Sequence, residues 1–436
     1  MQYLNRYWNP DESEYGPLLE RGSSTAGADR ETVANILDAV RREGDAALLR
    51  YSREFDGLTP SSLQVSQSEI DEAHTKVDDA LQSALLVAKA NIEAFHRAQL
   101  PQGERVASGG IELWREVVPI ERVGLYVPGG SAPLVSTVLM LAVPARVAGC
   151  ESIALCTPPR RDGSVDPAIL FAASLCNVTE IYRLGGAQAI AALAYGTETI
   201  PAVDKICGPG NSWVTEAKSQ VGSTVCAIDL PAGPSEVMVV SSALADPACV
   251  AADLLSQAEH GRDSQAMLVV RSSKEEGFAF IDEVEAQIAS HLRHLGRQSE
   301  LLASLAHSRA FVVPNQEKTA SLINAYAPEH LIITLESEAE ETALLALVHN
   351  AGSVFLGPWS PESSGDYASG TNHTLPTAGW ARSYSGLSVD SFVKKITVQR
   401  LSEEALRTLA PTLRALSDAE GLSAHRLAVD VRLEEQ

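Results

Sequence analysis

Four separated segments of the chain carry side chains that could bind a metal ion or move protons. In the first segment, Gln257 and His260 stand three residues apart at the end of a helical pattern, so their side chains share one helix face. Such a pair could converge on one ion, or it could cap the helix and interact with its dipole. The pair becomes a candidate metal site only if other segments supply further ligands.

The second segment places Glu329 beside His330, directly before an apolar strand pattern. A carboxylate next to an imidazole suits proton transfer, because it holds the imidazole pKa in the working range. Adjacent residues on an extended chain point to opposite sides, so both can serve one substrate only from a turn. Pro328 favours such a turn. The pair is therefore a candidate acid–base pair.

The third segment, residues 361–376, is dense in Gly, Ser and Asn and is long for a plain connector. Such loops often carry function, and this one offers Asp366 and His373. The fourth segment offers Glu420 and His425 at the start of the last predicted helix. Surface charge on a terminal helix is the simpler interpretation of these two residues.

Together the segments offer nitrogen and oxygen donors, which suit a catalytic zinc site with three or four protein ligands. The six cysteines contain no Cys-x-x-Cys pair and lie in mainly apolar stretches, which disfavours a thiolate site. Gln is an uncommon ligand. The candidate ligands are Gln257, His260, Asp366 and His425, and the candidate acid, base or recognition groups are Glu329, His330 and His373.

Two kinds of apolar pattern predict the helices and strands that must position these residues. Helical apolar spacing covers residues 28–55 and 66–100, and a hairpin-like pair follows at 105–120. From residue 123, short apolar runs alternate with helical stretches up to residue 356, which is typical of parallel sheets flanked by helices. A strand and two helices are predicted after residue 391. The sequence therefore predicts an α/β fold.

Glycine-rich turns follow strands at residues 124–130, 185–188 and 208–211. Their backbone N–H groups could bind a phosphate at a helix N-terminus, although plain strand-to-helix turns explain them equally well. The dinucleotide fingerprint GxGxxG, with an acidic residue about 20 positions later, is absent.

The bulk properties narrow the choice of partners. The chain has 436 residues, enough for at least two domains, and its net charge of -22 argues against nucleic acid. The N-terminus lacks the layout of a signal peptide. The longest apolar run, residues 134–148, is too short and too interrupted to span a membrane. We therefore expect a cytoplasmic protein.

In their order along the chain, residues 254–265, 324–331, 365–376 and 420–425 closely resemble the histidinol dehydrogenase family. The glycine turns and residues 232–236 agree, so the resemblance spans nearly the whole chain. It implies a zinc- and NAD-dependent enzyme that oxidises L-histidinol through L-histidinaldehyde to L-histidine, the last step of histidine biosynthesis.

The resemblance also implies roles for individual residues. One zinc ion per subunit is bound by Gln257, His260 and Asp366, joined by His425 from the other subunit of a homodimer. His330 takes the hydroxyl proton, and Glu329 activates the water that attacks the aldehyde. The substrate contacts all of these residues together with Ser235, His373 and Glu420, and the NAD contacts are Tyr126, Gln188 and Asn211.

The implied fold has two incomplete Rossmann-like βα domains, one inserted in the other, with an N-terminal arm and a C-terminal helical tail. The expected boundaries are 1–22 for the arm, 23–125 with 237–378 for the zinc domain, 126–236 for the NAD-contacting domain and 379–436 for the dimerisation tail.

Three alternatives differ in chemistry. A related dehydrogenase could oxidise another small alcohol, such as a sulfonated diol, but Ser235, His373 and Glu420 suit an imidazole and an ammonium better. A zinc site could also be purely structural, although such sites are usually closed by Cys and His. A nucleotide-binding module would leave the histidines and carboxylates unused.

Overall fold

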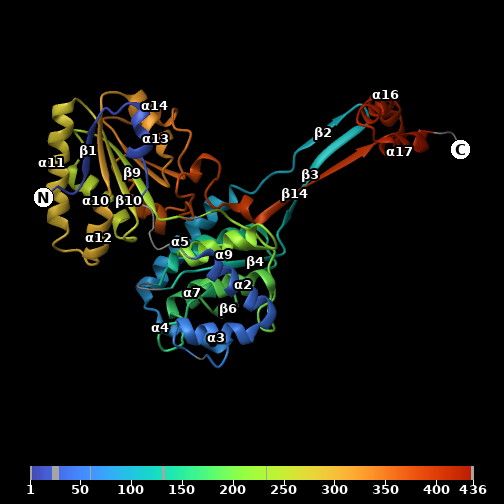
Figure 1. Ribbon diagram of the computed structural model, residues 1–436, viewed down its shortest axis with the longest axis horizontal. Helices are drawn as coiled ribbons and strands as arrows, with labels where there is room; N and C mark the ends of the chain where they lie inside the picture. Colours follow the sequence, from blue (N-terminus) through green and yellow to red (C-terminus); the bar gives the residue numbers. More distant parts are fainter. Residues whose placement is uncertain (1, 22–28, 59, 130–132, 232, 434–436) are drawn as a thin grey trace.

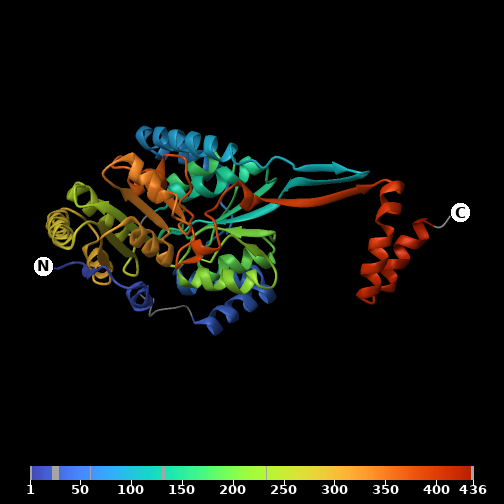
Figure 2. The ribbon, with the colours of Figure 1, turned by 90° about the horizontal axis from the view of Figure 1, so that it is seen from above.

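Two parallel sheets form the structure, and the central strands of the larger one contain unbroken runs of Val, Leu and Met, as is usual where helices cover both faces. Each sheet is the centre of one α/β body, and a long arm projects from them (Figures 1 and 2). The predicted α/β fold class is confirmed. The computed structural model describes residues 2–21, 29–58, 60–129, 133–231 and 233–433.

The first body contains a six-stranded sheet in the order β1-β11-β10-β9-β12-β13, with every pairing parallel. Its strands are β1 (Asn5–Trp8), β9 (Glu236–Ser242), β10 (Gln265–Arg271), β11 (Arg309–Val313), β12 (His330–Thr334) and β13 (Ser353–Leu356). One face packs against α10 (Pro247–Ala258), α11 (Lys274–His291) and α12 (Gln298–Leu305). The other packs against α1 (Tyr15–Leu18), α13 (Gln316–Tyr326) and α14 (Glu338–Leu345).

The second body contains a five-stranded parallel sheet in the order β6-β5-β4-β7-β8. Its strands are β4 (Arg122–Tyr126), β5 (Ser152–Thr157), β6 (Glu180–Arg183), β7 (Lys205–Cys207) and β8 (Ala227–Ile228). The helices between them are α6 (Val135–Ala148), α7 (Pro167–Leu175), α8 (Gly186–Tyr195) and α9 (Ser212–Gly222).

Four N-terminal helices also pack against this second body: α2 (Arg30–Glu43), α3 (Asp45–Phe55), α4 (Gln67–Lys76) and α5 (Asp79–Arg97). The buried faces of α2 and α3 share a core with α8, and α5 packs on α6. This packing differs from the expected grouping of residues 23–125 with 237–378. The apolar face of each helix is visible in the sequence, but the sheet that it covers is not.

The two long helical patterns are each divided. Gly44, with a φ of +56°, separates α2 from α3, and a side chain there would collide with Glu198. Asp78 starts α5 by accepting the N–H of Leu81, so the second pattern also becomes two helices. A capping box formed by Ser66 and Glu69 starts α4.

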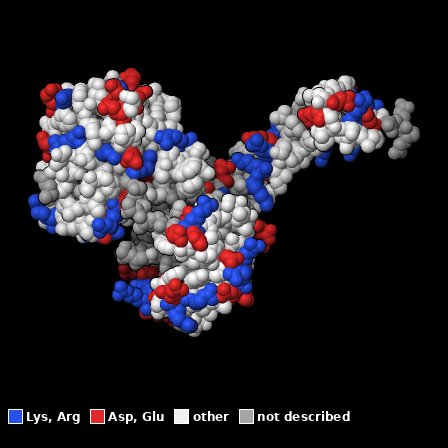
Figure 3. Space-filling view, in the orientation of Figure 1, with Lys and Arg blue, Asp and Glu red and all other residues white. Residues whose placement is uncertain are grey.

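The arm is an antiparallel ribbon in the order β14-β3-β2, capped by two helices that point away from both bodies (Figures 1 and 2). It consists of β2 (Arg105–Ser108), β3 (Ile111–Pro119), β14 (Val393–Leu401), α16 (Glu403–Ala419) and α17 (Ser423–Leu433). The tip shows uncharged surface beside acidic and basic side chains (Figure 3). The exposed apolar side chains of the whole arm include Ile396, Leu416, Leu427 and Val431.

Short elements complete the described structure. They are η1 (Glu12–Glu14), α15 (Glu362–Tyr367), η2 (Trp380–Arg382) and η3 (Val389–Phe392). Within the described ranges, no helix combines the length and the apolar character needed to cross a bilayer.

Candidate metal-binding active site

A cavity of about 640 Å³ lies between the two α/β bodies, with walls from both. One wall comes from residues around α6 and from Gly208 to Gly210, and the other comes from the first body, where Ser235 and the Glu329–His330 pair lie at the amino ends of β9 and β12. Six residues singled out in the sequence line this cavity: Ser235, His260, Glu329, His330, Asp366 and His373.

The last turn of α10 positions the first two candidate ligands. Gln257 is fully buried, and neither atom of its side-chain amide has a hydrogen-bond partner among the described residues. His260 lies in the turn that follows, with Nδ1 at 3.0 Å from the carbonyl oxygen of Ser256. A carbonyl only accepts, so Nδ1 carries the hydrogen and Nε2 keeps a lone pair for a metal ion.

A residue in the left-handed backbone conformation orients the Glu329–His330 pair. Ala327, at a φ of +55°, ends α13 and turns the chain into β12, whose first residue is His330. Glu329 Oε2 accepts the backbone N–H of Glu236 at 2.9 Å, which fixes the carboxylate beside the cavity. It lies 3.7 Å from His330 Nδ1, so the two adjacent side chains face the same space.

Residues 361–376 are not entirely a loop, because residues 362–367 form the short helix α15. Glu362 and Asp366 stand one turn apart on the helix and face His330 together. The Glu362 Oε1 atom is 3.7 Å from His330 Nδ1, and the Asp366 Oδ1 atom is 3.5 Å from His330 Nε2. Sequence reasoning missed Glu362, although its spacing of four residues from Asp366 is a helical signal.

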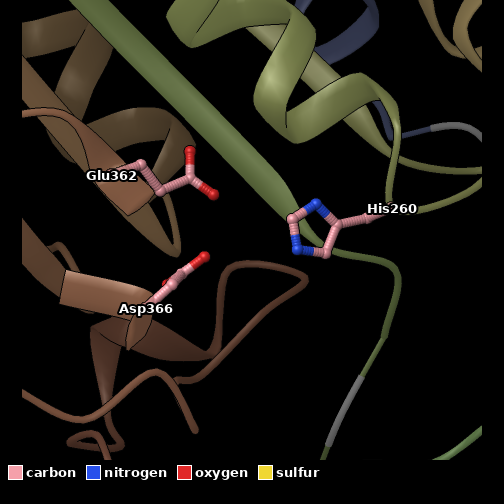
Figure 4. Close-up of side chains that lie close together, drawn as sticks. All are labelled: His260, Glu362 and Asp366. Atoms are coloured by element: carbon pink, nitrogen blue, oxygen red, sulfur yellow. The ribbon is translucent and has the colours of Figure 1, made fainter. Parts of the chain in front are cut away.

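Three side chains, two of which line the cavity, converge on one point. Figure 4 shows His260 approaching from the end of α10, while Glu362 and Asp366 come from α15. Their donor atoms all lie within 4.8 Å of one another. Small side-chain movements would bring all three to the bond length of about 2.0–2.2 Å that zinc requires.

Buried polar atoms without partners test whether this point suits a metal ion. Glu362 is 1% exposed, and neither of its carboxylate oxygens is hydrogen-bonded within the described chain. The same holds for Oδ1 of Asp366 and for the amide of Gln257. Polar atoms left in this state destabilise a fold, and a cation among them would satisfy all of them at once. The residues therefore fit a divalent ion held by nitrogen and oxygen.

Electrostatics support the same conclusion. Burial raises the pKa of Glu329 to about 8 and that of Glu362 to about 8. Burial lowers the pKa of His330, but the carboxylates of Glu362, Glu329 and Asp366 outweigh it and raise this pKa to about 10. A divalent cation would offset these negative charges, and the imidazole could then lose its proton near neutral pH.

His373 lines the same cavity but, unlike the charged cluster, is held uncharged. Burial lowers its pKa, so the ring is neutral at physiological pH. Its Nε2 atom lies 3.5 Å from the hydroxyl of Ser136 and 3.4 Å from that of Thr137, both on α6. A neutral imidazole held between hydroxyl groups is suited to hydrogen bonding with a polar heterocycle.

Three of the residues predicted to bind zinc or substrate are not among the residues that line this cavity: Gln257, which is buried in the last turn of α10, and Glu420 and His425. Glu420 directly follows α16 and His425 lies on α17, and both side chains are exposed. Their helices form the tip of the arm, away from both bodies (Figures 1 and 2).

A second cavity, of about 620 Å³, lies at the carboxyl ends of strands of the five-stranded sheet and brings together the three predicted NAD contacts, Tyr126, Gln188 and Asn211. The Tyr126 hydroxyl accepts the N–H of Gly186 at 3.1 Å. Asn211 caps α9 by accepting the N–H groups of Trp213 and Val214. The N-termini of α8 and α9 therefore both meet this cavity, where their dipoles favour an anion.

Comparisons with known proteins agree with one another. The family model described as histidinol dehydrogenase matches residues 19–433. A histidinol dehydrogenase of Bacteroides thetaiotaomicron is 50% identical over 434 residues, covering 99% of each chain. One from Vibrio vulnificus is 48% identical, covering 97% of this chain and 96% of that protein. The crystal structure of histidinol dehydrogenase from Elizabethkingia anophelis superposes with a TM-score of 0.95 at 45% identity, covering 99% and 98% of the two chains.

Proposed function

This chain belongs to the histidinol dehydrogenase family, and we propose how its two cavities divide the work of that reaction. It is an NAD-dependent oxidoreductase that catalyses the final step of histidine biosynthesis, the oxidation of L-histidinol to L-histidine. The observation that supports the placement of the chemistry is the convergence of His260, Glu329, His330 and Asp366 on one cavity. A sulfonated-diol dehydrogenase is not favoured.

We place one zinc ion per subunit among Gln257, His260 and Asp366. Glu362 faces the same point and is a further oxygen donor there. When bound, the ion would hold nitrogen atoms of the substrate and stabilise negative charge that develops on its oxygen. The unpartnered atoms of Gln257, Glu362 and Asp366 support this placement.

The chain's own residues then move the protons. His330, facing the cavity from the start of β12, accepts the hydroxyl proton of histidinol. Glu329, fixed by the N–H of Glu236, accepts a proton from the water that attacks the aldehyde. Its pKa of about 8 suits a group that must gain and lose a proton near neutral pH. Ser235 and His373, which line the same cavity, hold the substrate.

The second cavity is the NAD site of this proposal, with Tyr126, Gln188 and Asn211 as contacts. One loop joins it to the first cavity, because Gly208 to Gly210 line the first while Asn211 and Trp213 line the second. An extended dinucleotide bound in the second cavity can therefore reach the substrate, where it supplies the hydride acceptor.

The remaining two groups come from a second protomer in this proposal. The arm extends away from the two bodies and exposes apolar side chains. Burying these side chains against a second chain would stabilise the protein. In a homodimer with exchanged arms, Glu420 of the partner subunit contacts the substrate and His425 of the partner subunit completes the zinc site. We place this dimer in the cytoplasm.

Chelation tests the metal proposal directly. Enzyme stripped by a chelator should lose L-histidinol oxidation, and stoichiometric zinc should restore it together with one tightly bound ion per subunit. Full activity in protein that contains no metal would contradict the proposal.

A further inference from the structure

The second cavity contains a carboxylate that none of the sequence motifs included. Asp56 lies directly after α3 and lines this cavity together with Tyr126, Gln188 and Asn211. Its backbone N–H bonds to the carbonyl of Ser52 at 3.1 Å, but its side chain caps no helix. Within the described part of the chain, that side chain has neither a hydrogen bond nor an ion pair, so it is free to bind a ligand.

The residues that line the second cavity include both acidic and basic side chains. Asp56 is the one acidic residue among the described lining residues, and Arg160 and Arg161 are the basic ones. Arg160 pairs with Asp166 at 3.2 Å, outside the lining, and Arg161 is exposed. Burial raises the pKa of Asp56, and its charge makes a small addition to the effect of burial on the pKa of Tyr126. Asp56 therefore lines the cavity with a carboxylate that is open to solvent and accessible to a bound ligand.

The acidic and basic lining residues favour different parts of a bound dinucleotide. The pyrophosphate is doubly negative, so it is repelled by Asp56 and attracted to the N-termini of α8 and α9 and to the arginines. The ribose is neutral and has hydroxyl donors, which are what an unpaired carboxylate needs. Next to Asp56, Phe55 is 52% exposed and lines the same cavity as Pro158, so a flat adenine ring has apolar surfaces beside the sugar.

We propose that Asp56 accepts a hydrogen bond from the 2′-hydroxyl of the adenosine ribose and thereby selects NAD over its 2′-phosphorylated form. This inference rests on the proposed NAD site. In common dinucleotide folds an acidic residue shortly after the glycine fingerprint performs this task. Here that fingerprint is absent, and the carboxylate comes from α3, which precedes the entire sheet. A 2′-phosphate would place about two further negative charges against Asp56.

The test compares Asp56→Asn with wild type and with Glu54→Gln, which removes an exposed carboxylate two residues away that does not line the cavity. KM and kcat are measured for NAD and NADP with saturating L-histidinol. Loss of a charge-assisted hydrogen bond should raise the KM for NAD about tenfold or more, leaving kcat and the KM for histidinol near wild type. The ratio of kcat/KM for NADP to that for NAD should rise about tenfold or more.

A second readout avoids turnover. Metal-free wild-type protein should bind ADP-ribose more tightly than its 2′-phosphorylated form, and Asp56→Asn should reduce this difference. Asp56→Glu, which keeps the charge, should still reject NADP, and circular dichroism confirms that each variant is folded.

Two results would overturn the inference: an unchanged KM for NAD in Asp56→Asn, or equal weakening of NAD and NADP with no change in their ratio. Either result leaves the proposed function intact if wild type binds ADP-ribose and uses NAD. Failure of wild type to do so would instead refute the proposed NAD site.

Discussion

The carboxylate of Glu362 is buried one helical turn before Asp366, with both oxygens lacking a hydrogen-bond partner in the described structure. If it belongs to the metal centre, Glu362→Gln should weaken zinc binding about 10- to 100-fold, the range found when groups supporting a metal are removed. Competition with a chromophoric chelator measures this affinity, and the visible spectrum of the cobalt-substituted protein reports the change in ligand field.

Glu341→Gln is the matched control, because Glu341 is also buried but accepts the N–H of Leu335 on the far side of the first sheet. Equal zinc affinity and equal cobalt spectra in wild type and Glu362→Gln would remove Glu362 from the metal centre.

The raised pKa of Glu329 makes a prediction about stability. In the folded metal-free protein this pKa is about 8, against about 4.3 in an unfolded chain, so the folded state holds an extra proton between these values. The stability contributed by this proton is complete below pH of about 4 and is lost as the pH rises through about 8. Glu329→Gln cannot titrate, so its stability relative to wild type should increase from pH 5 to pH 8.

Denaturant unfolding of both metal-free proteins at the two pH values measures this difference. A difference between variant and wild type that is the same at pH 5 and at pH 8 would contradict the pKa and its cause.

Much of the site at this scale could be predicted, because Gln257, His260, Glu329, His330 and Asp366 each stand in a recognisable local pattern. Glu362 could not, since a segment rich in Gly and Ser predicts a loop and hides the turn of helix that pairs it with Asp366. Asp56 could not either, because nothing local distinguishes it from a solvated residue at a helix end.

At the scale of elements, α15 is held in place by close packing at Gly365. A Cβ atom at this position would lie 2.5 Å from Cε1 of Phe355 on β13. Gly365→Ala should therefore displace the helix and destabilise the protein by about 1–3 kcal/mol, the usual range for an overpacked core. Because α15 presents Glu362 and Asp366 together, zinc affinity should fall as well.

Ser363→Ala, on the exposed side of the same helix, serves as the control and should change neither property. Thermal unfolding and chelator competition measure the two effects. Wild-type zinc affinity in Gly365→Ala would show that the site does not depend on the position of α15.

The alternation of strands and helices after residue 123 could be predicted because buried parallel strands leave unbroken apolar runs. The pairing of β1 with β11 and the packing of α2 to α5 on the second sheet could not. These contacts join residues far apart in the sequence, and the apolar face of a helix does not specify which sheet it covers.

At the scale of the whole molecule, Glu420 and His425 belong to the helices α16 and α17 at the tip of the arm, which projects away from both bodies (Figure 2). Exchanged arms predict complementation between two inactive variants, His425→Ala and His330→Gln. A mixed dimer has one intact site, made by the cavity of one variant and the arm of the other. With random pairing, half of the dimers are mixed, so about a quarter of wild-type activity should return.

Unmixed samples of each variant are the controls, and sedimentation confirms the dimer. Activity no higher than the average of the two inactive parents would contradict arm exchange. A helical tail could be predicted from the sequence, but its distance from the body could not, because that depends on the pairing of β14 with β3.

The measurement that tests the central claim most directly is the number of NADH molecules formed per L-histidinol consumed, followed by near-ultraviolet absorbance. Two oxidations in one cavity, with Glu329 activating water for the second, predict two NADH per histidinol in wild type. Glu329→Gln should keep its zinc and stop near one NADH. One NADH per histidinol in wild type would show that the cavity performs only the first oxidation and would remove the water-activating role from Glu329.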